Sequence, residues 1–209
     1  MRRLPITIIT ALVLSLVVAA ALLGCEASTQ TSASDKSKSE ANESEETSKE
    51  DAKIHSAMSA APTSIAKDAR IVDYPEKAGK PLIELREGAN GWTCFPDWQA
   101  TPGKDPMCFD KMWMQWFDAI SNAIDPNIKQ PGIAYMLQGG SDASNTDPFA
   151  MKPKEGEHWV SAPAHVMLIV PGKLDKTFFS TDHHSGEPWV MYAGTPYEHV
   201  MIPVEEEIK

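Results

Sequence analysis

Five of the six histidines lie after residue 157, and this is the only part of the chain where imidazoles, which could bind a metal or transfer protons, are clustered. The tripeptide His-Val-Met occurs twice, starting at His165 and at His199, and each copy opens an apolar run. Asp182 and His184 lie between the copies in a polar stretch. Imidazoles with a carboxylate could hold zinc with a water in an open position, or supply a general base with an orienting acid. A metal-dependent or His/Asp-based hydrolase would therefore use His165, Asp182, His184 and His199.

The spacing of these residues matches no defined metal or catalytic motif such as H-E-x-x-H, and G-x-S-x-G is also absent. If both tripeptides open strands of one sheet, alternate residues share a face and each histidine lies at a rim of the sheet. Two strand-end histidines and a hydrated turn explain the same pattern without any chemistry. The identity of a metal or cofactor stays open.

A second candidate site is the stretch over residues 138–148, which is dense in oxygen ligands and follows an apolar run. Calcium prefers carboxylate, amide and carbonyl oxygens held by a flexible loop. The ligand-binding candidates are Asp142, Asn145 and Asp147. The spacing is not that of an EF-hand, and Asp and Asn that bond their own backbone in a turn explain it equally well.

The elements that position these residues are short. One apolar face recurs with helical spacing over residues 107–124, with Asp105 as the expected N-cap and Pro106 in the first turn. We interpret the tryptophans of this helix as core residues. Apolar runs typical of strands cover residues 81–86, 91–95, 133–137, 165–170, 189–193 and 199–204. Because few helix-length segments separate them, we predict a single α+β domain, with a mainly antiparallel or mixed sheet and one principal helix packed on a face.

The start of the chain has the parts of an export signal. Two arginines precede an apolar run over residues 4–23, which is also long enough for an uncleaved membrane span. The run ends with Leu22, Gly24 and Cys25, and this ending resembles the lipobox of bacterial lipoproteins. The resemblance implies that residues 1–24 are removed and that Cys25 is lipidated, which anchors the chain to a membrane. Glu26 favours the outer membrane over the inner.

Residues 25–69 form the next segment, rich in Ser, Glu and Lys. Up to residue 53 it has no large apolar side chain, so it cannot bury enough surface to offset its ordering entropy. We predict a disordered tether over 25–69, in which residues 54–69 either hold a short helix or continue the tether, and a compact domain over 70–209. The formal net charge of −10 argues against nucleic acid as a partner.

The two remaining cysteines, Cys94 and Cys108, lie in the compact part of an exported chain. An oxidising compartment favours a disulfide between them, and the absence of a C-x-x-C pair makes zinc the poorer alternative. Oxidised cysteines cannot serve as nucleophiles.

Several polar motifs occur together in the compact part: GWTC at 91–94, PMC at 106–108, SNTDP at 144–148, STD at 180–182 and GTPY at 194–197. In this combination, residues 70–204 resemble an uncharacterised family of exported bacterial proteins. The resemblance implies one structural unit, and we hypothesise that the motifs surround a shared pocket.

Taken together, the sequence predicts a lipoprotein of the bacterial cell envelope that binds a small ligand, an ion or an envelope protein. A hydrolase is the alternative. Trp92, Trp98 and Trp189 could line a binding site, although core packing explains each of them too.

Overall fold

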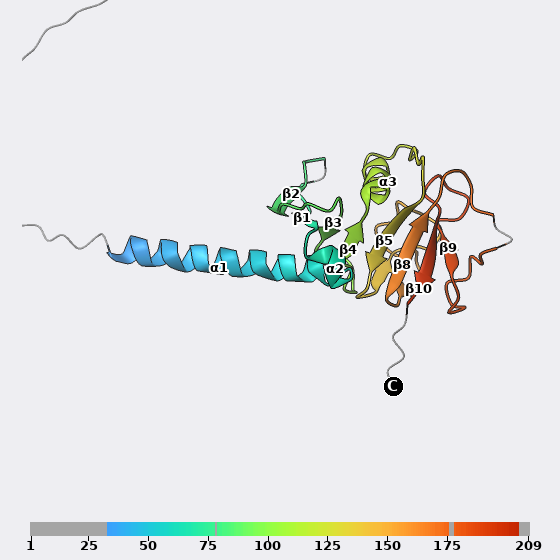
Figure 1. Cartoon of the computed structure of the whole chain (residues 1–209). Coiled ribbons are helices and arrows are strands. Elements are labelled where there is room, and N and C mark those ends of the chain that lie inside the picture. The colour runs from blue at the N-terminus through green and yellow to red at the C-terminus, as the bar shows by residue number, and fades with distance from the viewer. Residues whose placement is uncertain (1–32, 78, 176–177, 205–209) are drawn as a thin grey trace, which may run out of the picture. The chain divides into compact units, whose positions relative to one another are not determined.

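The computed structural model describes residues 33–77, 79–175 and 178–204 (Figure 1). By its contacts the chain divides into two units, residues 1–40 and 41–209. The helices are α1 (Ala33–Met58), α2 (Thr63–Ala66) and α3 (Lys111–Ser121). The export signal and Cys25 lie outside the described residues.

Most of the second unit is built on one sheet of eight strands, in the order β2-β1-β3-β4-β5-β8-β10-β9. Its strands are β1 (Arg70–Asp73), β2 (Ile83–Arg86), β3 (Thr93–Phe95), β4 (Met107–Phe109), β5 (Gly132–Met136), β8 (His165–Ile169), β9 (Trp189–Met191) and β10 (His199–Pro203). The pair β1–β3 is parallel and the other pairs are antiparallel. A separate hairpin joins β6 (Gly140–Asp142) to β7 (Val160–Ala162). The prediction of a mixed α/β fold with a mixed sheet is confirmed.

The strands expected over residues 81–86 and 91–95 exist as β2 and β3, but they do not pair with each other. β1 lies between them, antiparallel to β2 and parallel to β3. The side chains of Ile71 and Val72 in β1 are fully buried and belong to different clusters, so both faces of this four-residue strand are covered.

The expected start of the helix at residue 107 is wrong, because residues 107–109 form β4 and pair with β3. α3 starts at Lys111, and Asp110 is its N-cap: the carboxylate accepts hydrogen bonds from the backbone N–H groups of Met112 and Trp113 at 2.8 and 2.9 Å. Asp105, the expected cap, has a different set of contacts. The apolar face of the helix is as predicted, with Met112, Trp113 and Trp116 buried.

Two clusters of buried side chains lie on the two sides of the sheet, because successive residues of a strand point to opposite faces. The aromatic cluster includes Phe95 and Phe109, and the disulfide cluster includes their neighbours Cys94 and Cys108. The buried residues of α3 belong to the aromatic cluster, together with residues of β4, β5, β8, β9 and β10. The packing of one principal helix across a face of the sheet stays a prediction.

The predicted disulfide is present, and it joins directly opposed residues of neighbouring strands. Cys94 of β3 and Cys108 of β4 are register partners, and their sulfur atoms are 2.05 Å apart. Both residues are fully buried.

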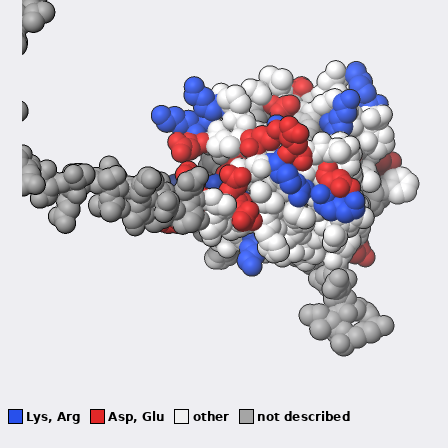
Figure 2. Space-filling model, turned by 60° about the vertical axis from the view of Figure 1, so that its left-hand side comes forward, with Lys and Arg blue, Asp and Glu red and all other residues white. Residues whose placement is uncertain are grey.

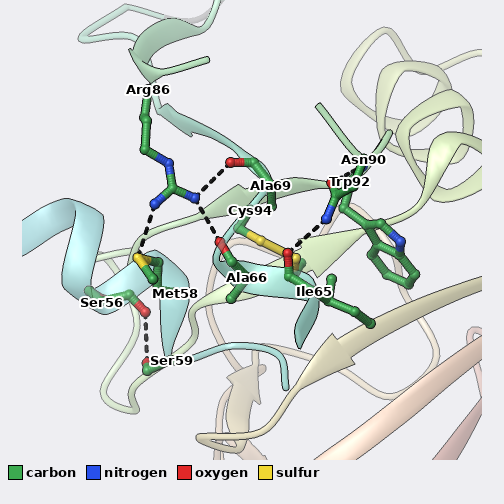
Figure 3. The surroundings of a disulfide bond; sticks show 11 residues. Ser56, Met58, Ser59, Ile65, Ala66, Ala69, Arg86, Asn90, Trp92 and Cys94 are labelled. Carbon is green, nitrogen blue, oxygen red and sulfur yellow. Dashed lines mark hydrogen bonds between the residues drawn. A yellow bond between two sulfur atoms is a disulfide. The ribbon is translucent and has the colours of Figure 1, made fainter. Parts of the chain in front are cut away.

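The segment just before β1 differs from the disordered tether expected over residues 25–69. α1 and α2 lie within that range, and the disulfide cluster includes five buried alanines from it, Ala57, Ala60, Ala61, Ala66 and Ala69. Small side chains let the backbone approach the sheet closely. Figure 3 shows Arg86 of β2 reaching into this segment, where it donates to the backbone oxygens of Ala66 and Ala69 at 2.7 and 2.8 Å.

Charged side chains form separate groups on the surface seen in Figure 2, with uncharged surface between them. Acidic and basic side chains stand next to one another there, and neither sign forms a continuous area. Among the described residues, no helix combines the length and apolarity needed to cross a membrane.

Candidate functional site

A cavity of about 870 Å³ lies among α3, the sheet and the hairpin β6–β7. Its size is within the range of sites that hold drug-sized molecules. The wall is mainly apolar. It includes the aromatic side chains of Phe109, Trp113, Trp116, Phe117, Trp159, Trp189 and Tyr192 and the six methionines Met107, Met136, Met151, Met167, Met191 and Met201.

Four residues of this wall have a buried polar atom without a hydrogen-bond partner among the described residues. These atoms are the hydroxyl oxygen of Tyr74, Nε1 of Trp113, Nε1 of Trp116 and Nε2 of His165. Buried polar groups are normally paired, because an unpaired one costs about 1–3 kcal/mol. No other side chain that the structure describes has such an atom, so the unpaired groups are concentrated at this cavity.

His165 and His199 both line the cavity and have the same local hydrogen bond. Nδ1 of His165 lies 2.7 Å from the carbonyl oxygen of Pro163, and Nδ1 of His199 lies 3.0 Å from that of Tyr197. A carbonyl oxygen only accepts, so each Nδ1 carries the hydrogen and each neutral ring has an acceptor lone pair on Nε2. Burial lowers the pKa of both imidazoles, to about 4 for His199.

The two histidines start β8 and β10, as predicted, but the strands run in opposite directions. His165 pairs with Pro203, four residues beyond His199, so their backbones are roughly 13 Å apart along the sheet. His199 lies edge-on to the rings of Trp113, Trp116 and Tyr192, with centroids 5.2, 5.4 and 5.5 Å away. At 1% and 2% exposure, both histidines are interior residues.

Asp182 and His184 do not line the cavity. They lie in an exposed turn, where the Asp182 carboxylate accepts from the backbone N–H of His184 at 2.9 Å. The structure therefore brings together two of the four residues proposed for hydrolysis. Within residues 33–77, 79–175 and 178–204, no three His, Cys, Asp or Glu side chains are placed to hold a metal ion.

The three candidates of the 138–148 stretch have different surroundings. Asp142 lines the cavity and accepts a hydrogen bond from the hydroxyl of Tyr192 at 2.7 Å. Asn145 ties its loop to β9, because its Oδ1 accepts from Trp189 Nε1 at 3.1 Å. Asp147 accepts from the backbone N–H of Phe149 within its own turn. Of the three candidates, only Asp142 is among the described residues that line the cavity.

The three tryptophans named from the sequence lie in two different places. Trp98 and Trp189 line the cavity, and Trp98 is exposed at 39%. Trp92 belongs to the disulfide cluster, with its ring centroid 5.5 Å from that of Tyr135.

Asp105 and Gly140 line the cavity, although nothing in the sequence marked either of them as a binding residue. Asp105 is 4% exposed, and its Oδ1 accepts from the backbone N–H of Ser141 at 2.6 Å. Its Oδ2 accepts from the Thr101 hydroxyl. Burial raises the pKa of the Asp105 carboxyl. Asp105 stands before a proline ahead of an apolar run, the usual signal for a helix cap, and no other local signal marks it.

The electrostatic character of the cavity is acidic. Asp105, Asp118 and Asp142 line it, whereas Lys80, an exposed residue, is the one Lys or Arg among the lining residues that the structure describes. Burial also raises the pKa of Asp142, and the negative charge of Asp105 adds to that rise. The arrangement can accommodate an apolar molecule with polar groups and disfavours an anion.

The search for similar proteins returned nothing: no protein-family model, no curated protein and no solved structure matches the chain.

Proposed function

We propose that this chain is a lipid-anchored binding protein of the bacterial cell envelope, whose folded domain holds a small, largely apolar molecule in the cavity. One observation carries the proposal. Four wall residues have buried polar atoms without partners beside a cavity large enough for a ligand. Such groups are costly in the empty protein, and since the four atoms are themselves covered, a ligand with complementary donors and acceptors removes the cost once the flexible methionines of the wall move aside.

The envelope location rests on the sequence. The export signal over residues 1–24 and the lipobox-like ending support lipidation at Cys25, which makes the membrane a partner through the anchor. The outer membrane is the favoured site of attachment. The resemblance to an uncharacterised family of exported bacterial proteins is consistent with this location. Replacement of Cys25 by Ser is expected to abolish labelling by radioactive palmitate, whereas labelling that survives the replacement would contradict the anchor.

We also infer that α3 packs on one face of the sheet and closes the cavity there. The buried side chains of Met112, Trp113 and Trp116 share one cluster with strand residues, and the two tryptophans line the cavity. This interpretation places both indole N–H groups beside the ligand.

The hydrolase alternative requires His165, Asp182, His184 and His199 to converge within about 3 Å of one another's hydrogen-bonding atoms or a shared water. His165 and His199 line the cavity and Asp182 and His184 do not, so we favour binding over hydrolysis.

The binding proposal can be tested with the neutral fluorescent probe N-phenyl-1-naphthylamine and the full chain in lipid nanodiscs. Tryptophans of the wall should transfer energy to a bound probe, so a saturable signal with one probe per chain is expected above that of empty nanodiscs. Ala162→Trp places a large ring in the cavity wall and should abolish the saturable part. Val166→Trp adds the same ring to a residue outside the wall and serves as the control. A signal that does not saturate, or that Ala162→Trp leaves intact, would contradict a ligand in this cavity.

A further inference from the structure

We propose that the ligand is an organic cation, a primary amine with an apolar body, whose ammonium group lies beside Gly140 between the Asp105 carboxylate and the His165 imidazole. This inference rests on the proposed function, since it names the class of molecule that the cavity takes. Three independent features of the wall support it: a gap of suitable position, a pair of acceptors that lack a cation, and the aromatic surroundings.

Residue 140 is glycine, so only the terminal methyl group of Met136 fills the space beside it, and the gap opens when that methyl group moves away. A Cβ atom at this position would lie 3.5 Å from Oδ1 of Asp105 and 3.7 Å from Cε1 of His165, so it would be in contact with both side chains. Its closest neighbour, at 2.7 Å, is the terminal methyl group of Met136, a flexible side chain that can move away. Gly140, Asp105 and His165 all line the cavity, which connects the gap to the rest of the ligand space.

The two side chains that flank the gap accept hydrogen bonds. His165 donates through Nδ1 to Pro163, so its unpaired Nε2 has a lone pair and requires a donor. The Asp105 carboxylate accepts from a backbone N–H and a hydroxyl, which carry no net charge. An ammonium group has three N–H donors and no lone pair, so it matches a carboxylate and an imidazole nitrogen together.

The charge of the wall favours the same ligand. Asp105 and Asp142 are close enough for the charge of one to raise the pKa of the other, and neither has an ion-pair partner among the described residues. A buried charge without a partner is costly, and a cationic ligand supplies the missing partner. A carboxylate ligand would instead add a third negative charge to the same space.

An aromatic ring lies near the proposed ammonium site. Tyr74 lines the same cavity and is close enough to Asp105 for its charge to act on the Tyr74 hydroxyl, and the face of such a ring attracts a cation. The methionines and Phe117 offer apolar surface for the remainder of the ligand. A small inorganic cation would leave this surface without a partner, so the chemistry fits an amine on an apolar body.

The test compares three probes that share one body: 4-phenylbutylamine, 4-phenylbutan-1-ol and 4-phenylbutanoate. They are titrated calorimetrically into the full chain in nanodiscs, with empty nanodiscs subtracted, at a pH where the amine is protonated. Because a hydrogen bond to a charged group contributes about 1.5–3 kcal/mol, the amine should bind about tenfold more tightly than the alcohol or better, and the acid most weakly. Equal binding of amine and alcohol would overturn the inference and leave the proposed function standing.

The variant Asp105→Asn should remove most of the preference for the amine over the alcohol, while Asp118→Asn, the same change of charge at an exposed wall residue, should retain it. If Asp105→Asn does not fold, Gly140→Ala gives the decisive comparison, because its methyl group fills the gap and should weaken amine binding more than alcohol binding. A preference that survives both substitutions overturns the inference. If none of the three probes binds although the naphthylamine probe does, the inference fails alone. If that probe fails as well, the proposed function fails with it.

Discussion

Tyr192 donates its hydroxyl hydrogen to Oδ2 of Asp142 across a distance of 2.7 Å, and this bond links the residue that follows β9 to the hairpin β6–β7. Both residues line the cavity, and burial raises the pKa of the Asp142 carboxyl. The bond therefore stabilises a carboxylate in surroundings that disfavour its charge.

Tyr192→Phe should lower the free energy of unfolding by about 1–3 kcal/mol at neutral pH, because it removes a donor from a buried carboxylate. The loss should become smaller as the pH falls and Asp142 becomes protonated. Chemical denaturation at neutral and acidic pH measures both effects. Tyr135→Phe is the control, since its hydroxyl makes no hydrogen bond among the described residues. Equal losses in the two variants would show that the Asp142 bond does not contribute.

The disulfide should stabilise the domain mainly by restricting the unfolded chain. It joins cysteines 14 positions apart, and a loop of this size corresponds to about 3 kcal/mol. The double variant Cys94→Ala, Cys108→Ala should therefore unfold at lower urea concentration. A reducing agent should have a similar effect on the natural chain and none on the double variant, and a natural chain insensitive to reduction would contradict the prediction.

Arg86→Ala should destabilise the attachment of α2 to the sheet. The guanidinium donates to two backbone oxygens, Ala66 at 2.7 Å and Ala69 at 2.8 Å, and also lies 3.2 Å from Sδ of Met58 (Figure 3). Leaving these oxygens without a donor should cost about 2–4 kcal/mol. Arg70→Ala is the matched control.

The control breaks an exposed ion pair, since Arg70 Nε lies 2.5 Å from the Glu84 carboxylate, and such pairs contribute about 1 kcal/mol or less. Urea denaturation of both variants compares the two arginines. A smaller loss for Arg86→Ala than for Arg70→Ala would contradict the role assigned to Arg86.

His199 should make the stability of the domain depend on pH. Burial lowers its pKa from 6.5 to about 4, so the unfolded state binds a proton more readily than the folded state between these values. The contribution of uncharged His199 to the free energy of unfolding is complete above pH 6.5. It is lost as the pH falls towards 4, by up to about 3 kcal/mol.

His199→Asn removes this titration and should reduce the slope of the stability profile between these limits; part of the slope remains, because burial also lowers the pKa of His165. His184→Asn, at an exposed residue, should leave the slope unchanged. Asp105 and Asp142 have raised pKa values and so act in the opposite direction, but they remain in both variants. Parallel pH profiles for the natural chain and His199→Asn would contradict the prediction.

Local patterns predicted much of the fold. The helical spacing of Met112, Trp113 and Trp116 identified the buried face of α3, and the cysteine count identified the disulfide. The helix start was wrong because Asp105-Pro106 has the composition of a cap, while the pairing of β4 with β3 depends on a partner elsewhere in the chain.

The cavity was less accessible to such reasoning. Tyr74, Asp105, Gly140 and His165 are separated by 25 to 35 positions in the sequence, and only the folded sheet brings them to one wall. The histidine cluster correctly indicated His165 and His199 as residues of one site. Asp182 and His184 were included because they lie between these two in the sequence, and they do not line the cavity. A loop between two strands lies at their ends, and nothing in its composition tells whether it turns towards the cavity or away from it.

The six methionines of the cavity wall have a consequence for redox chemistry. A thioether is flexible and polarizable, so a wall of this kind can adapt to ligands of different outline. Conversion of these thioethers to sulfoxides would make the same surface polar and chiral. Met151, at 72% exposure, is the member that a dissolved oxidant meets first, so oxidative damage to this protein should begin at one edge of its ligand space and spread inward.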